Sequence, residues 1–410
     1  MRKIAIVGAG QAGLQLALGL RAHDYDVTVV TNRSARDLRD GRVMSTQCMF
    51  ADALATERRL GIDFWEGEAP SIKGFHVTVV GPDGGKAVEW EARLDDPAQS
   101  VDQRIKFSRW LEEFERRGGT LRIADAGLAD LDELAAGHDL VLVAAGKGDI
   151  AALFERDPER SPYDAPQRAL AVAYVHGMRP RESFVAVGVS VIPTAGELFQ
   201  MPALTKSGPC DILFFEAVPG GPLDAFGGIR DPHEHLARTK ELLEAFLPWE
   251  AERAGDARLT DDQGTLAGRF PPTVRRPVGT LPSGRPVLGV ADAVVLNDPI
   301  TGQGSNSAAK CADVYLRAIV ERGGEPFDAE WMEATFARFW DYAQWVTRWT
   351  NMFLAPPPPH ALQLLGAPME VPGVGRWIAN GFNHPPSLFP AWQDPQAAER
   401  LIAEQAVAPA

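Results

Sequence analysis

The chain has few cysteines, no long apolar run and no excess of basic side chains. Its 410 residues include only three cysteines, Cys48, Cys210 and Cys311, which lie far apart and form no Cys-x-x-Cys pair. This usage disfavours a structural zinc site or a disulfide framework and is typical of the reducing cytoplasm. No stretch approaches the roughly eighteen unbroken apolar residues of a membrane-spanning helix. We therefore expect a cytoplasmic protein that does not span a membrane.

The net charge of −14 excludes further classes of partner. Nucleic acids and anionic membranes both bind basic protein surfaces, so neither is an expected partner of this acidic chain. A composition with 45% apolar and 23% charged residues is that of a globular enzyme. The length allows one very large domain or two to three ordinary ones.

A glycine motif is present at the start of the chain. A short apolar run, Ile4 to Val7, leads directly into Gly8-x-Gly10-x-x-Gly13, and a helix-periodic stretch follows. Gly8 permits a tight turn, Gly10 lets a pyrophosphate approach the backbone, and Gly13 lets the helix pack on the sheet. A second apolar run at 27–31 supplies the next parallel strand. The pattern predicts a dinucleotide site, against the simpler interpretation of a glycine-rich turn in an ordinary α/β protein.

Periodicity beyond this motif predicts mixed α/β structure. Apolar runs at 120–124 and 140–145 indicate further buried strands, and the spacing at 51–60 and 101–117 indicates helices. A hairpin pattern (75–80 and 86–94) and four β-type runs (169–174, 184–191, 196–201 and 211–216) indicate an inserted antiparallel sheet. Helical spacing returns at 232–246, 305–322 and 328–351.

A second glycine cluster occupies residues 286–306. There a buried run ends near Asp292, and a Pro299-x-x-Gly302-Gln303-Gly304-x-Asn306 loop opens a helix. The aspartate can bond the sugar-like chain of a flavin, and backbone N–H groups of the loop can face an electron-rich ring edge. Paired with the first motif, this cluster matches FAD enzymes of the hydroxylase type. The first site would hold the ADP half, and the second would hold the ribityl chain and isoalloxazine.

Further motifs make the chain resemble the styrene and indole monooxygenases, the flavin subunits of two-component aromatic-alkene epoxidases. The resemblance extends through most of the chain. Its most specific pieces are Pro166-Gln-Arg168-Ala-Leu, Gly302-Gln-Gly304-x-Asn306 and Thr347-Arg-Trp-Thr-Asn351. Other pieces are Gly41-Arg42-x-x-x-Thr46, Val101-Asp102-x-Arg104, Gly196-Glu-Leu-x-x-x-Pro202 and Gly289-x-x-Asp292.

The resemblance implies an α/β fold with a Rossmann-like FAD-binding domain of the hydroxylase (GR2) type, an inserted antiparallel-sheet substrate domain and C-terminal helices. We expect residues 1–70, 95–165 and 280–325 to form the FAD domain, 71–94 and 166–279 the substrate domain, and 326–410 a helical segment. It also implies that reduced FAD and O₂ form a C4a-hydroperoxide that epoxidises a small aromatic alkene or indole. An NADH-dependent flavin reductase would deliver the reduced FAD, because no second nucleotide motif is present. The sequence leaves a homodimer open.

The site residues follow from the two motifs and the resemblance. No amino-acid nucleophile or metal is needed, and Ser45 and Gln47 are candidates for positions near the flavin. The predicted cofactor residues are Gly8, Gly10, Gly13, Arg33, Arg42, Gln103, Asp292, Pro299, Gly302, Gln303, Gly304 and Asn306. The predicted substrate pocket consists of Ser45, Gln47, Met49, Phe75, Phe199, Met201 and Phe214, although each apolar member is also an ordinary core residue by type.

Two departures from expected patterns bear on binding. Thr31 or Asn32 stands where an Asp or Glu usually grips the ribose, so modest affinity for FAD is expected. Ser45 stands where the family has Asn, which leaves the identity of the substrate open.

Four alternatives stay open at this point. They are a flavin-dependent halogenase, a self-sufficient NAD(P)H-dependent aromatic hydroxylase, a dehydrogenase or oxidase, and a non-catalytic flavin-binding protein. The Trp-x-Trp-x-Ile-Pro motif of the halogenases is missing from the sequence.

Overall fold

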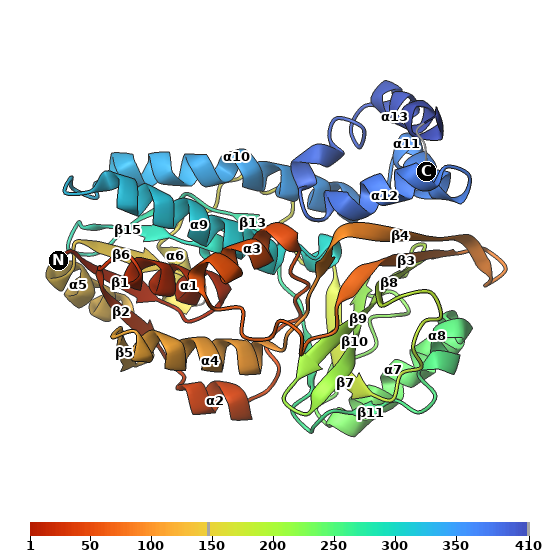
Figure 1. Cartoon of the computed structure of the whole chain (residues 1–410), viewed down its shortest axis with the longest axis horizontal. Helices are drawn as coiled ribbons and strands as arrows, with labels where there is room; N and C mark the ends of the chain where they lie inside the picture. Colours follow the sequence, from red (N-terminus) through yellow and green to blue (C-terminus); the bar gives the residue numbers. More distant parts are fainter. Residues whose placement is uncertain (146–147, 408–410) are drawn as a thin grey trace.

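Two β-sheets organise the chain in this computed structural model, which describes residues 1–145 and 148–407 (Figure 1). The first sheet has the strand order β14-β15-β6-β1-β2-β5. All its neighbouring strands are parallel except β14 and β15. Its strands are β1 (Lys3–Val7), β2 (Asp26–Thr31), β5 (Thr120–Ile123), β6 (Leu140–Val143), β14 (Val278–Thr280) and β15 (Pro286–Gly289).

Helices cover both faces of this sheet, which explains the continuous apolar runs of its strands. Ile4, Ala5 and Ile6 of β1 are fully buried, as parallel strands between two helical layers require. The predicted Rossmann-like fold is therefore confirmed. The helices of this part are α1 (Gln11–Arg21), α2 (Ala35–Asp40), α3 (Ala51–Leu60), α4 (Gln103–Arg116), α5 (Leu128–Gly137), α6 (Gly148–Ala152) and α9 (Gly304–Arg322).

The second sheet has the order β11-β7-β10-β9-β8-β3-β4, and β12 also pairs with β7. Its pairs are antiparallel except β3 with β8, which run parallel. The chain passes through the first part of the molecule between these two strands, and a parallel pair needs such a long crossover. The strands are β3 (Ile72–Val80), β4 (Lys86–Ala98), β7 (Ala169–His176), β8 (Ala186–Ile192), β9 (Gly196–Thr205), β10 (Gly208–Ala217), β11 (Arg258–Leu259) and β12 (Thr265–Gly268).

Different elements cover the two faces of the second sheet. The helices α7 (Pro232–Phe246) and α8 (Pro248–Arg253) pack on one face. The loop at 43–50 and the helices α11 (Pro359–Gly366), α12 (Pro372–Gly381) and α13 (Pro395–Val407) pack on the other. The long helix α10 (Ala329–Leu354) contributes Phe339 to the core of the first sheet and Trp349 to that of the second. Short elements complete the fold: β13 (Thr273–Val274), β16 (Val295–Leu296), η1 (Ala291–Ala293), η2 (Pro299–Thr301), η3 (Ala367–Met369) and η4 (Pro385–Leu388).

Within the described residues, no helix has both the length and the apolar character needed to cross a membrane.

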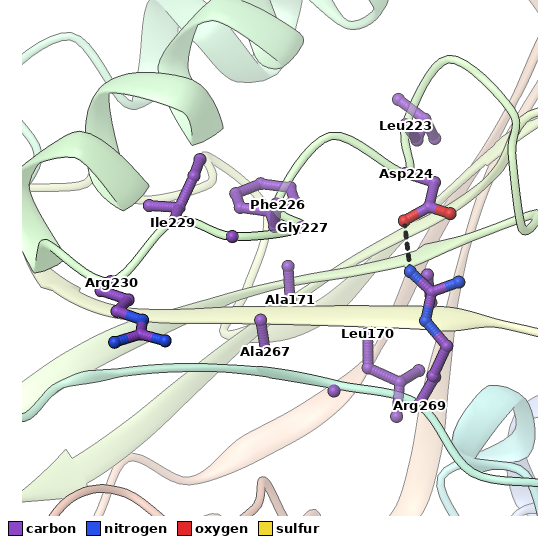
Figure 2. A pocket seen from close by; sticks show the side chains of 13 residues that line it. Leu170, Ala171, Leu223, Asp224, Phe226, Gly227, Ile229, Arg230, Ala267 and Arg269 are labelled. Atoms are coloured by element: carbon purple, nitrogen blue, oxygen red, sulfur yellow. Dashed lines mark hydrogen bonds and ion pairs between the residues drawn. The ribbon is translucent and has the colours of Figure 1, made fainter.

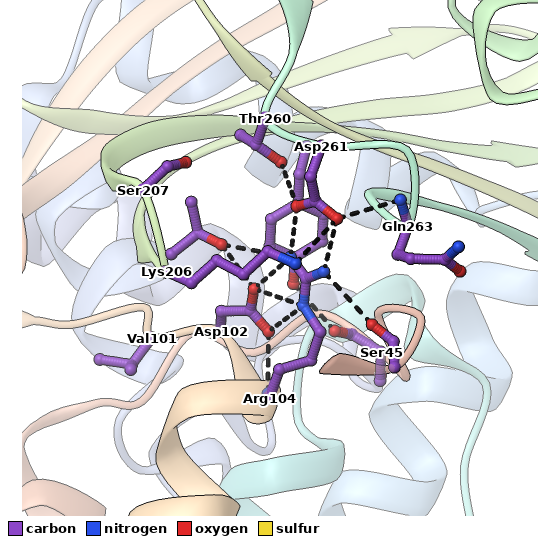
Figure 3. Close-up of polar contacts among 12 residues, drawn as sticks. Ser45, Val101, Asp102, Arg104, Lys206, Ser207, Thr260, Asp261 and Gln263 are labelled. Carbon is purple, nitrogen blue, oxygen red and sulfur yellow. Dashed lines mark hydrogen bonds and ion pairs between the residues drawn. The ribbon is translucent and has the colours of Figure 1, made fainter. Parts of the chain in front are cut away.

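A buried arginine joins the two parts of the molecule (Figure 3). The Arg104 guanidinium is fully buried and donates to the Asp102 carboxylate at 2.9 and 2.7 Å and to Asp261 at 2.9 and 3.0 Å. Asp102 caps α4, whereas Asp261 follows β11 in the second sheet. Burial alone would raise the pKa of Asp261, but the hydrogen bonds and charge of Arg104 lower it to about 2.

Replacing Arg104 should therefore weaken the contact between the two parts of the molecule and lower the stability of the protein. Arg104→Met leaves the buried Asp102 carboxylate without its countercharge and leaves Asp261 with Lys206 alone, at 3.2 Å. We therefore expect a loss of about 3–5 kcal/mol in the free energy of unfolding. Arg39→Met is the matched control, because Arg39 makes a solvent-exposed pair with Glu112 at 2.7 Å, worth about 0–1 kcal/mol. Urea unfolding of both variants at neutral pH measures the difference. Equal losses would contradict the role of Arg104.

Candidate active site

Two uncapped helix N-termini lie at the same end of the molecule. Gln15 of α1 donates to the carbonyl oxygen of Ala309 in α9 at 2.9 Å, and further along a Cβ at Gly19 would lie 2.6 Å from Leu316. The residue numbers rise together in both helices, so α1 and α9 run side by side in the same direction. Neither helix has a side-chain N-cap hydrogen bond or an acidic residue in its first turn. Their free N–H groups therefore suit an anionic or electron-rich ligand.

The three glycines of the first motif have separate physical roles. Gly8 has φ +116°, and a Cβ there would lie 2.8 Å from the Ala144 backbone. A Cβ at Gly13 would lie 2.1 Å from the Gly8 carbonyl oxygen. Gly10 differs from both, because a Cβ there would have no other described atom within 4 Å. Gly8 and Gly13 therefore allow segments of the backbone to pack closely, whereas Gly10 leaves space open at the N-terminus of α1.

The second motif forms a similar open loop. Gly302 has φ +62°, and Cβ atoms at Gly302 or Gly304 would meet no other described atom within 4 Å. Helix α10 holds the loop in place: Thr347 donates to Asn297 at 3.0 Å, and the hydroxyls of Thr350 and Thr301 share a hydrogen bond of 2.7 Å. This is the physical reason for the Thr-Arg-Trp-Thr-Asn motif.

Asp292 lies beyond the end of β15, at the same sheet edge as Gly8. Its side chain is exposed, yet so much protein surrounds it that desolvation raises the pKa of its carboxyl to about 6. This position lies at the carboxyl ends of parallel strands, where ligands of open α/β sheets bind.

Two predicted cofactor residues direct their side chains into the protein. Gln303 donates to the carbonyl oxygen of Phe382 at 3.0 Å. Asn306 donates to the carbonyl oxygen of Cys48 at 2.7 Å and accepts from the N–H of Phe50 at 2.9 Å. Both amides therefore join the second glycine loop to other segments. Pro299, at the start of η2, is half-buried beside them.

The loop at 41–50 lies between the second glycine loop and the second sheet. Arg42 and Ser45 are exposed, and the Ser45 carbonyl oxygen accepts from the Tyr174 hydroxyl at 2.9 Å. Gln47 is buried and donates to the carbonyl oxygen of Val101. Met49 is buried against α3 and α9, away from the apolar face of the second sheet.

Arg33 and Gln103 lie on the first part of the molecule, whereas Arg42 lies toward the second sheet. Arg33 is exposed just beyond β2, and Thr31 ends that strand where an acidic residue would usually stand. Gln103 is the first residue of α4 and is almost fully buried. Burial, and then the charge of Arg42, lower the pKa of His235 on α7 to about 4, so Arg42 lies close to the second sheet's helices.

Four predicted pocket residues share one face of the second sheet. Phe214 pairs with Phe199, Met201 pairs with Ile212, and Phe75 belongs to the same apolar cluster. Two unpredicted aromatics complete this face, since the Phe75 ring lies 4.4 Å from that of Phe382 and 6.2 Å from that of Phe50. Phe50 is the N-cap of α3 and Phe382 the C-cap of α12, so no strand periodicity in the sequence links either ring to Phe75.

A surface hollow lies on another part of the molecule (Figure 2). It has a volume of about 310 Å³ and is lined by β7, β12 and the segment 223–230. Ala169 and Ala171 belong to the core under α7, on the face opposite Phe214. An ion pair of 3.1 Å between Arg269 and Asp224 occupies one end. This hollow lies on the opposite side of the second sheet from Phe214, so it is separate from the apolar face described above.

The arrangement fits FAD, because two open N-termini, Asp292 and the exposed Arg33 lie at one sheet edge. No group of three His, Cys, Asp or Glu side chains suited to a metal ion occurs among the described residues. The apolar face of the second sheet could hold an aromatic substrate.

Solved structures with low sequence identity share this fold. The flavin-dependent brominase Bmp2 aligns over 98% of both chains with a TM-score of 0.65 and 14% identity. The p-nitrophenol 4-monooxygenase PnpA from Pseudomonas putida aligns over 99% of this chain and 98% of the other, with a TM-score of 0.62 and 14% identity. A flavoprotein/dehydrogenase from Cytophaga hutchinsonii gives a TM-score of 0.68 at 13% identity, with 98% of this chain and 99% of the other covered.

Sequence relatives are more specific. The styrene monooxygenase StyA of Pseudomonas fluorescens is 30% identical over 404 residues, 96% of each chain, and StyA of a second Pseudomonas species matches to the same extent. Residues 146–253 match the family described as "Styrene monooxygenase A putative substrate binding domain". With the fold and the two glycine loops, these matches define an FAD-dependent monooxygenase that uses O₂. The chain belongs to the styrene monooxygenase family, as its sequence motifs predicted.

The contrast between Gly10 and Gly13 can be tested directly. Gly10→Ala adds a methyl group to open space, so the variant should unfold like the wild type but bind FAD about tenfold more weakly, equivalent to about 1.4 kcal/mol. Gly13→Ala should instead lower the stability of the cofactor-free protein, because its methyl group meets the Gly8 carbonyl. Flavin fluorescence titration and thermal unfolding separate the two effects. Unchanged FAD affinity in Gly10→Ala would remove this space from the cofactor site.

Proposed function

We propose that this monooxygenase epoxidises an electron-rich aromatic alkene of the styrene or indole type, through a flavin C4a-hydroperoxide formed from reduced FAD that a separate NADH-dependent reductase supplies. The single observation that carries the proposal is the apolar face of the second sheet, where Phe75 contacts Phe382, whose carbonyl oxygen accepts from Gln303 of the second glycine loop. Reduced FAD, when bound, supplies the activation of O₂. The protein has to orient the alkene and exclude water.

Asp292 and the residues of the two glycine loops support this division of labour. Gly10 and the first turn of α1 would hold the pyrophosphate, and Arg33 and Arg42 would add positive charge to the ADP portion. Asp292 would bond the ribityl hydroxyls, and the backbone at Gly302 and Gly304 would face the isoalloxazine. Gln303 and Asn306 would act through the loop that they hold in place.

The substrate side would be the apolar face of the second sheet. Phe75, Phe199, Met201 and Phe214 would contact the aromatic ring, and the exposed side chain of Ser45 would lie between the ring and the flavin. Gln47 and Met49 would support the loop from behind, because both are buried. The reductase would dock as a separate protein.

The source of electrons is tested with purified components. Protein with FAD and NADH alone should leave the flavin oxidised and yellow. Chemically reduced FAD with O₂ and a panel of vinylarenes and indoles should give an epoxide, or its rearrangement product, that carries label from ¹⁸O₂. Rapid bleaching by NADH alone would favour a self-sufficient hydroxylase. An unlabelled product would favour a dehydrogenase or oxidase.

The substrate face is tested by neighbouring residues of β10. Phe214 faces the proposed chamber, whereas Phe215 is buried against α7 on the opposite face. Phe214→Leu and Phe215→Leu should each cost about 1–2 kcal/mol of unfolding free energy. Only Phe214→Leu should change KM for the alkene, because only that ring would contact it. Equal effects on KM would move the substrate away from this face.

A further inference from the structure

The hollow behind the second sheet has the form of a slot between two apolar layers (Figure 2). Phe226 and Ile229, from the segment after β10, form one layer. Ala171 of β7 and Ala267 of β12 form the other, and these two alanines are register partners, so their methyl groups lie side by side on one face. A flat apolar group in the slot would therefore contact hydrocarbon on both sides.

Packing and hydrogen bonds hold the Phe226 side of the slot in place. Phe226 is buried, and the centre of its ring lies 4.6 Å from that of His235 on α7. Asp224 fixes the start of the same segment, because its carboxylate accepts from the N–H of Gly220 at 2.9 Å and pairs with Arg269 at 3.1 Å. The slot is therefore formed before a ligand arrives, which lowers the cost of binding.

Small residues keep the slot open. A Cβ at Gly227, Gly228 or Gly268 would meet no described atom beyond its chain neighbours within 4 Å. Gly228 also has φ +84°, a conformation that favours glycine. Ala267 is exposed within β12, where a larger side chain would fill the slot. The opening therefore depends on the residue types at these positions as well as on the path of the backbone.

The two arginines that line the slot differ in their partners. Asp224 neutralises Arg269 at one end, whereas at the other end no carboxylate of the described residues lies within ion-pair distance of Arg230. The neighbouring Asp231 is the N-cap of α7, and its carboxylate accepts from two backbone N–H groups of that helix, each at 2.9 Å. The slot therefore has an excess positive charge at the Arg230 end.

Volume and chemistry together define the class of ligand. The slot holds about 310 Å³, near the lower limit of the roughly 300–1,000 Å³ that is typical of small-molecule sites. One ring or two fused rings match that volume, whereas a dinucleotide is too large for it. An aromatic ring suits Phe226, because rings attract one another edge to face or with offset faces. A carboxylate suits Arg230, because a guanidinium can donate two parallel hydrogen bonds to it.

We propose that this slot binds a small planar aromatic carboxylate, with its ring between Phe226 and the two alanines and its carboxylate on Arg230. The binding is non-covalent and involves no chemical step. The slot is separate from the proposed substrate face, because Ala171 and Phe214 lie on opposite faces of the second sheet. The inference goes beyond the proposed epoxidation and does not depend on it, so binding can be measured whether or not an alkene is oxidised.

Isothermal titration calorimetry with 2-naphthoate tests the role of charge. The wild type should bind one equivalent with a dissociation constant of about 0.1–1 mM. Arg230→Gln should weaken binding about tenfold, because it removes the partner of the carboxylate. Arg230 is exposed, so this variant should fold. Arg238→Gln is the matched control, since Arg238 is an exposed arginine of α7 that pairs with Glu241 at 3.3 Å, and it should bind like the wild type.

The neutral analogue 2-naphthamide separates the carboxylate from the ring. It should bind the wild type about tenfold more weakly than 2-naphthoate does, and it should bind Arg230→Gln as weakly as it binds the wild type. Equal affinity of the wild type for the amide and the carboxylate would overturn the pairing with Arg230.

The alanine layer is tested by a side chain that fills the slot. Ala267→Leu should weaken 2-naphthoate binding by about tenfold or more, because the added carbon atoms would occupy the space of the ring. Ala87→Leu is the matched control, since Ala87 is likewise exposed, on β4 at the opposite edge of the same sheet. Its affinity for 2-naphthoate should equal that of the wild type. Thermal unfolding of both variants verifies that they are folded.

The position of the ligand is tested against the proposed cofactor and substrate sites. Saturating FAD, or the variant Phe214→Leu, should leave 2-naphthoate binding unchanged. Binding that FAD or Phe214→Leu abolishes, while Arg230→Gln and Ala267→Leu retain it, would move the ligand to the other face of the sheet and overturn this inference. A wild type that binds no 2-naphthoate would also overturn it. The proposed epoxidation is judged separately, by the labelled product.

Discussion

The parallel packing of α1 against α9 is the constraint on which the site depends. The two helices come from opposite ends of the chain, yet the hydrogen bond of 2.9 Å between Gln15 and Ala309 and the contact of Gly19 with Leu316 align them in one direction. Two sets of free N–H groups therefore open at one sheet edge. Without this alignment, the proposed binding of one FAD molecule by both glycine motifs would not be possible.

The loop at 41–50 connects the sheet edge proposed for the cofactor to the second sheet. Asn306 holds it from the second glycine loop, and Tyr174 holds it from the second sheet. Arg104 adds a third attachment, because its guanidinium also donates to the Gly41 carbonyl oxygen at 3.4 Å. The side chains that fix this loop are buried and polar, and such groups are stable only when their partners are in place.

The second sheet has an apolar face that ends in charge. Phe214 pairs with Phe199 across neighbouring antiparallel strands. Glu216, two residues after Phe214, pairs with Glu197, two residues before Phe199. The strand period of two puts all four side chains on one face. A face of this kind suits a reaction in which a hydrocarbon has to approach a polar redox centre while water stays outside.

The sequence alone determined the local features and the class of cofactor. Glycine spacing between apolar runs predicted β1, α1 and the start of α9, because backbone freedom and burial are local properties of residue type. Family motifs predicted the FAD-dependent monooxygenase, and alternation placed Phe199 and Phe214 in the second sheet. Tertiary structure alone decided that the side chains of Gln303 and Asn306 bond to other segments of the protein, and that the ring of Phe382 contacts that of Phe75. It also decided that Arg168 is the cation nearest to the carboxyls of Glu197, Glu216 and Asp298. These depend on contacts between segments tens to hundreds of residues apart, and the energy of a buried polar or aromatic group is set by such partners and not by its neighbours in sequence.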